Sequence, residues 1–98
     1  MDENLVYMYT ETKNRVRDIL RNKVNGIVRT EYNIPARILV IDICYKDFNF
    51  RKIITDFDKF VFGEKDTDEI ISIVIGTYKK ELMRTFFREG GYSNYGRY

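Results

Sequence analysis

A single stretch, residues 36–45, constrains the fold more than any other part of the chain. It reads Ala-Arg-Ile-Leu-Val-Ile-Asp-Ile-Cys-Tyr and is apolar at nearly every position. Its β-branched residues favour a strand, in which successive side chains point to opposite faces. One face would carry Leu39, Ile41, Ile43 and Tyr45, and the other Ile38, Val40, Asp42 and Cys44. A strand that is apolar on both faces is expected to be covered on both.

The segments before this stretch predict a helix and a partner strand. Between Glu3 and Asn25, apolar side chains recur at three- and four-residue steps, which indicates a long amphipathic helix. Asn25-Gly26 is a typical helix end. Residues 27–32 then alternate, with Arg29 and Glu31 facing away from the apolar positions. The sequence therefore predicts a two-stranded antiparallel ribbon formed by about residues 27–32 and 36–45.

Two more helices are predicted after the ribbon, at about residues 49–62 and 67–89. Apolar residues at helical spacing favour the first, and Asp66 followed by Glu69 resembles a capping box before the second. Residues 70–76 are β-branched enough to form a strand instead, but the four-residue spacing continues further and favours a helix.

The predicted fold is α+β, with residues 1–90 as one globular domain and residues 91–98 as a flexible Tyr/Gly tail. A chain of 98 residues has room for one domain with a modest core. An isolated two-stranded ribbon is only marginally stable. Three helices could cover both of its faces, but a two-fold homodimer is the simpler solution. Its predicted interface consists of Ile38, Val40, Asp42 and Cys44.

The residue types present exclude several kinds of catalytic and metal site. Histidine is absent, which removes Ser-His-Asp and Cys-His catalysis and zinc sites that contain histidine. The only cysteine, Cys44, cannot form a thiolate metal site by itself, and the glycines lack the spacing of a phosphate-binding loop. We therefore expect no cofactor, no metal and no enzymatic activity.

Asp42 is the residue that comes nearest to a catalytic signature. Its place between two isoleucines resembles the first metal-binding aspartate of polynucleotidyl transferases of the ribonuclease H type. That fold needs more strands than this chain has room for, and a metal nuclease needs further converging carboxylates. An enzyme that uses Asp42 is thus the weakest of three hypotheses. A buried carboxylate requires a partner, and the candidates are Arg37, Arg51 and Lys52.

A basic row near the C-terminus is the main candidate for a binding site. It lies on the last predicted helix and leads into the tail; together they contain Lys80, Arg84, Arg88, Tyr92, Tyr95, Arg97 and Tyr98. These side chains would suit nucleic acid, by stacking bases and contacting phosphates. They would equally suit a protein partner, because Tyr and Arg are frequent at binding hot spots. The third interpretation is a solvated helix face followed by a disordered end.

Charge and hydropathy narrow the expected function. The net charge of +2 is lower than a dedicated nucleic-acid-binding domain usually carries. The acidic start of the chain does not resemble a signal peptide, and no apolar run approaches the ~20 residues of a membrane span. We expect a soluble cytoplasmic protein: a small non-enzymatic interaction module of the viral or phage accessory type that binds another protein as a homodimer. The alternative is a nucleic-acid-binding protein that uses the C-terminal basic row and the tail, together with a second basic row at Lys13, Arg17 and Arg21 on the first helix.

Overall fold

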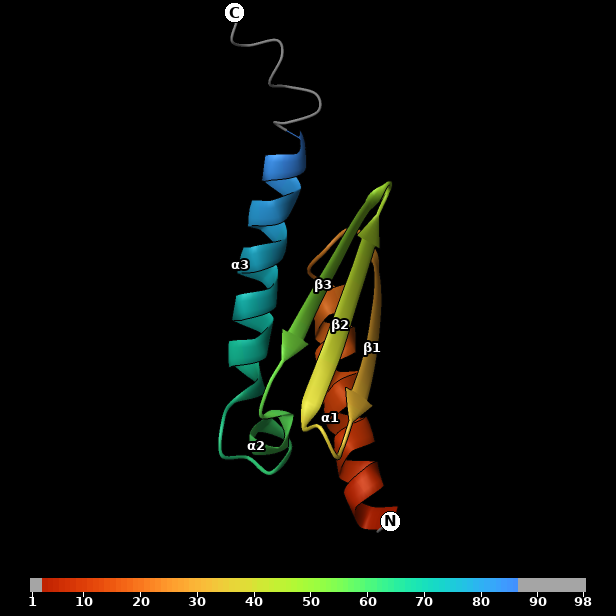
Figure 1. Ribbon diagram of the computed structural model, residues 1–98, viewed down its shortest axis with the longest axis vertical. Coiled ribbons are helices and arrows are strands. Elements are labelled where there is room, and N and C mark those ends of the chain that lie inside the picture. Colours follow the sequence, from red (N-terminus) through yellow and green to blue (C-terminus); the bar gives the residue numbers. More distant parts are fainter. Residues whose placement is uncertain (1–2, 87–98) are drawn as a thin grey trace, which may run out of the picture.

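The computed structural model describes residues 3–86, which form an α+β fold (Figure 1). The three strands make one antiparallel sheet in the order β1-β2-β3. In chain order the elements are α1 (Glu3–Arg21), β1 (Ile27–Asn33), β2 (Ile38–Tyr45), β3 (Phe48–Ile54), α2 (Phe57–Val61) and α3 (Thr67–Phe86). The predicted α+β class, the long N-terminal helix and a β1–β2 ribbon are therefore confirmed.

The helices lie on one side of the sheet, where α1 contacts β1 and α3 contacts β3 (Figure 1). The core fills the space between the helices and the sheet. It contains Val16 and Leu20 of α1, Leu39 and Ile41 of β2 and Val74 of α3, all fully buried. Only the face of β2 that carries Leu39, Ile41 and Ile43 packs against the helices, so the expectation that both faces are covered is not met within residues 3–86.

The bounds of the two long helices, α1 and α3, are close to those predicted where they can be compared. The buried residues of α1 follow three- and four-residue steps, and the helix ends at Arg21, slightly before the predicted end near Asn25. Residues 70–76 are helical, as the longer spacing indicated. The Asp66 carboxylate accepts a hydrogen bond of 3.0 Å from the backbone N–H of Asp68, which caps α3. The predicted end of this helix and the tail at 91–98 lie outside the described residues.

The prediction of a helix over residues 49–62 is wrong for most of its length. Residues 48–54 form β3, so the sheet has three strands instead of two, and α2 is only a short helix. Phe50 and Ile54 are both buried. Residues four apart share a face in a helix and also in a strand, so their spacing fits either structure. β2 then gains a hydrogen-bonded neighbour on its second edge, which a helix could not supply.

A tight hairpin joins β2 to β3. Tyr45 and Phe48 are directly paired, and only Lys46 and Asp47 lie between them. Lys46 has a φ of 56°, a conformation that glycine or asparagine adopts more readily. The loop lacks the glycine that usually marks a hairpin in a sequence, and this is why the third strand was missed.

Within residues 3–86, no helix combines the length and the apolar character needed to cross a membrane.

Candidate functional site

The sheet face that points away from the helices is uncovered in the part of the chain that the structure describes. Alternate residues of each strand lie on it, and we call this surface the open face. It consists of Ile27, Arg29, Glu31 and Asn33 of β1, Ile38, Val40, Asp42 and Cys44 of β2, and Asn49, Arg51 and Ile53 of β3. The four residues predicted as a dimer interface therefore lie together on one exposed surface, and β1 and β3 extend it on both sides.

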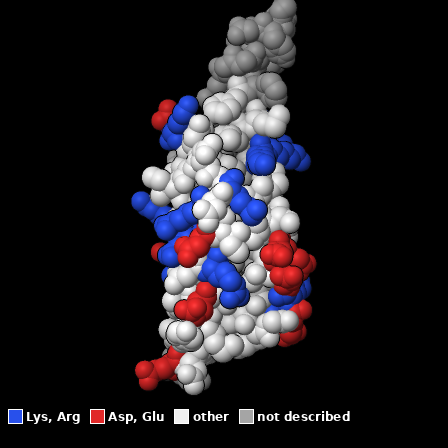
Figure 2. Space-filling view, turned by 180° about the vertical axis from the view of Figure 1, so that it is seen from behind, with Lys and Arg blue, Asp and Glu red and all other residues white. Residues whose placement is uncertain are grey.

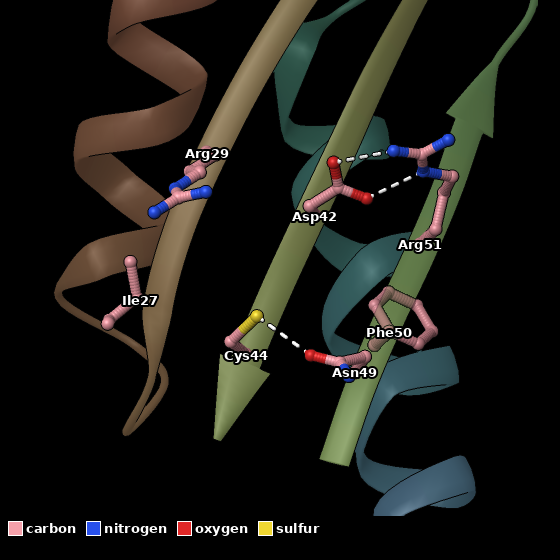
Figure 3. Close-up of a pocket in the computed structure, with 7 residues that line it drawn as sticks. All are labelled: Ile27, Arg29, Asp42, Cys44, Asn49, Phe50 and Arg51. Carbon is pink, nitrogen blue, oxygen red and sulfur yellow. Dashed lines mark hydrogen bonds and ion pairs between the residues drawn. The ribbon is translucent and has the colours of Figure 1, made fainter. Parts of the chain in front are cut away.

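The middle of the open face is a charged row across all three strands. Arg29, Asp42 and Arg51 are direct neighbours in the register, with the carboxylate between the two guanidinium groups (Figure 3). Arg51 Nε and Nη2 donate hydrogen bonds of 2.7 and 3.0 Å to the two carboxylate oxygens of Asp42. One of the three partners predicted for Asp42 is thus confirmed.

This ion pair holds its side chains in place more than it stabilises the fold. Both groups face solvent, where ion pairs contribute little to stability. The hydrogen bond and the negative charge of Asp42 raise the pKa of the Arg51 guanidinium above its ordinary value, so Arg51 stays charged. Within the described residues, no three His, Cys, Asp or Glu side chains gather where they could hold a metal ion.

Two shallow hollows flank the charged row, and apolar side chains lie along them. One hollow, of about 360 Å³, extends from the row to Ile27 and Cys44. The other, of about 240 Å³, extends to Val40. The Cys44 thiol donates a hydrogen bond of 2.9 Å to Asn49 Oδ1 (Figure 3). The open face therefore combines a charged centre with an apolar region at either end.

The predicted basic row is only partly described, and an acid accompanies it. Lys80 and Arg84 are exposed on α3, and Arg84 Nη1 lies 2.9 Å from Glu81 Oε2. The remaining predicted members lie outside the described residues; they are Arg88, Tyr92, Tyr95, Arg97 and Tyr98.

The basic row of α1, Lys13, Arg17 and Arg21, likewise contacts other groups. Lys13 Nζ lies 5.6 Å from the centre of the Tyr32 ring, and Arg17 pairs with Asp18. On the helical side of the molecule, Lys and Arg are interspersed with Asp and Glu, and neither sign forms a continuous field (Figure 2). This surface lacks the basic stripe that phosphate binding favours.

Residues of the open face outside β2 were only partly anticipated from the sequence. The outward direction of Arg29 and Glu31 followed from the alternation in β1 and is confirmed. Asn49 was missed as the neighbour of Cys44, and Ile53 as the neighbour of Val40, because the segment that carries Asn49 and Ile53 was assigned to a helix. The alternation of residues 48–50 was the available signal.

Comparison of the chain with protein-family models, curated proteins and solved structures found no match. Its function must therefore be inferred from its own surfaces.

Proposed function

We propose that the protein is a small non-enzymatic interaction module that acts as a homodimer, and that two copies meet through their open faces. The observation that carries this proposal is the exposure of apolar side chains on the open face, on both sides of the charged row. Ile53 is 49% exposed and Ile27 is 61% exposed, although both belong to strands whose opposite face is buried. The two isoleucines lie on opposite sides of the charged row, and exposed apolar areas bordered by polar side chains can mark a contact site.

The charges of the open face suit a second copy of the same surface. A two-fold axis places a surface against itself, so the surface must complement its own charge pattern. The open face carries two arginines, Arg29 and Arg51, and two acids, Glu31 and Asp42. Arg29 and Glu31 make no ion pair within residues 3–86. In a face-to-face dimer, Arg29 of one copy can pair with Glu31 of the other.

The size of the open face predicts a dimer of moderate affinity. Three strands about 4.8 Å apart, each rising about 3.3 Å per residue over seven or eight residues, cover about 14 by 23–26 Å. Two such faces have a combined flat area of roughly 700 Å², which is below the roughly 1,200 Å² of standard interfaces and in the range of weak, transient ones. We therefore expect a dissociation constant in the micromolar range.

Ile53→Glu is expected to weaken the dimer roughly 100-fold, because it places a carboxylate in the apolar part of the contact, and 100-fold corresponds to about 2.7 kcal/mol. Sedimentation equilibrium from low micromolar to near-millimolar concentration measures the change. The control is Ile73→Glu on α3, because Ile73 is 47% exposed but lies away from the open face. Circular dichroism confirms that both variants are folded.

A wild-type protein that remains monomeric over the whole concentration range would contradict the proposal. So would a dimer that Ile73→Glu disrupts and Ile53→Glu does not.

A further inference from the structure

A separate hollow lies on the helical side of the molecule, between the end of α1 and the C-terminal half of α3. It has a volume of about 220 Å³, and we call it the helix groove. Its lining includes Lys23, Val24, Tyr78, Lys79, Leu82 and Phe86. The sheet separates the helix groove from the open face, so both sites are accessible in one molecule.

A buried hydroxyl in the helix groove lacks a hydrogen-bond partner. Tyr78 is 3% exposed, and its Oη makes no hydrogen bond among the residues that the structure describes. Its ring is fixed by an edge-on contact with Phe50, at 5.5 Å between ring centres. Burial raises the pKa of this phenol, so the hydroxyl keeps its proton and is a donor. Buried tyrosine hydroxyls usually find an acceptor. Tyr78 lines the groove but its hydroxyl is enclosed, so an acceptor of a ligand would reach it by displacing the side chains that cover it.

The charge of the helix groove favours an anionic ligand. Lys23, just after α1, and Lys79 of α3 both line it and are exposed, and neither makes an ion pair within residues 3–86. Among residues 3–86, none of those that line the groove is acidic. Leu82 and Phe86 add apolar surface, and half of Phe86 is exposed. An acceptor with a negative charge and an attached apolar group would match all of these features.

We propose that the helix groove binds a short acidic peptide segment of another protein. A Glu or Asp carboxylate of the segment lies between Lys23 and Lys79 and accepts the hydrogen bond of the Tyr78 hydroxyl. A neighbouring aliphatic or aromatic side chain packs on Leu82 and Phe86. The volume fits one or two side chains and is smaller than the roughly 300–1,000 Å³ of a typical small-molecule site, which favours a peptide.

A random peptide library displayed on phage, selected on the full-length protein and counter-selected on Lys79→Glu, tests this proposal. We expect enriched peptides to place Asp or Glu beside an apolar residue. For a dye-labelled copy of such a peptide, fluorescence anisotropy should show roughly tenfold weaker binding to Lys79→Glu, from the reversed charge. Lys80→Glu, the neighbouring lysine outside the groove, is the matched control and should bind as the wild type does.

Tyr78→Phe separates the ligand role of the hydroxyl from a structural role. It should weaken peptide binding about fivefold, the value of one lost hydrogen bond. In the free protein it should leave the Tm unchanged or raise it, because the hydroxyl has no partner to lose among residues 3–86. A Tm that falls, or peptide affinity that does not change, would overturn the assignment of Tyr78.

Other outcomes would assign the groove to a different occupant or to none. The peptide proposal is overturned if none of the enriched peptides binds more weakly to Lys79→Glu than to the wild type. It is equally overturned if the enriched peptides lack acidic residues. It is also overturned if a single-stranded oligonucleotide binds more tightly than the peptides, with the steep salt dependence of phosphate contacts. Tighter peptide binding after deletion of residues 87–98 would assign the groove to the end of this chain. Ile53→Glu should bind peptide normally, so failure of the dimer proposal leaves this one intact.

Discussion

Phe57→Ala is expected to lower the free energy of unfolding by about 3–5 kcal/mol, the usual cost of removing a large aromatic side chain from a core. Phe57 is completely buried, and its ring packs edge-on against Tyr9 at 5.6 Å between ring centres. Its backbone N–H donates a hydrogen bond of 2.9 Å to the carbonyl of Arg37, which attaches α2 to the β1–β2 turn. The free energy of unfolding of a small domain is only about 5–15 kcal/mol in total, so this variant should be close to unfolding.

The control for Phe57 is Phe62→Ala, just after α2. Its ring also approaches Tyr9, at 6.1 Å, but Phe62 is 49% exposed. A half-exposed ring leaves no enclosed cavity, so we expect a loss of less than about 1.5 kcal/mol. Urea unfolding followed by circular dichroism measures both variants, at one protein concentration because a dimer makes apparent stability depend on concentration. Equal losses for the two variants would show that Phe57 is not a core residue.

Gly26→Ala is expected to lower the free energy of unfolding by about 1–3 kcal/mol, the usual cost of an overpacked site. A Cβ at this position would lie 2.8 Å from the carbonyl oxygen of Cys44 and 3.1 Å from Ile43 Cγ2. The carbonyl belongs to the central strand, whose hydrogen bonds on both edges keep it from moving. The strain must therefore displace β1, the strand that Gly26 leads into.

The same substitution at Gly76 should have the opposite sign. Gly76 lies inside α3, and a Cβ there would meet no atom within 4 Å. Alanine favours a helix interior over glycine by about 0.8–1.0 kcal/mol. Thermal unfolding should therefore show a lower Tm for Gly26→Ala and a higher Tm for Gly76→Ala. Shifts in the same direction would contradict the close approach of Gly26 to the central strand.

The open face and the helix groove lie on different sides of the molecule, and their charges suit different partners. The open face is neutral and mixes apolar side chains with two arginines and two acids, which suits a copy of itself. The helix groove has two lysines and no acid among its described lining residues, which suits a different, acidic partner. A dimer joined at the open faces would present one helix groove on each outer side. It could then hold two acidic segments at once, and the second would gain from a high effective concentration.

Local patterns in the sequence determined the helices and strands whose conformation depends only on residues that are close together in the chain. The three- and four-residue steps of α1 bury one helix face whatever the helix packs against. Alternation in residues 38–45 separates Leu39 and Ile41 from Val40 and Asp42, because a strand places neighbours on opposite faces. The cap formed by Asp66 is also local, since the donor N–H lies two residues away.

Only the tertiary structure decided the third strand and the sites that depend on it. Phe50 and Ile54 share a face in either a helix or a strand, and pairing with β2 selects the strand by satisfying a whole edge of backbone groups. The row through Asp42 to Arg51 exists only because of that pairing. The Tyr78 hydroxyl, which makes no hydrogen bond within residues 3–86, likewise depends on contacts between distant segments, because no local spacing encodes the three-dimensional neighbours of a side chain.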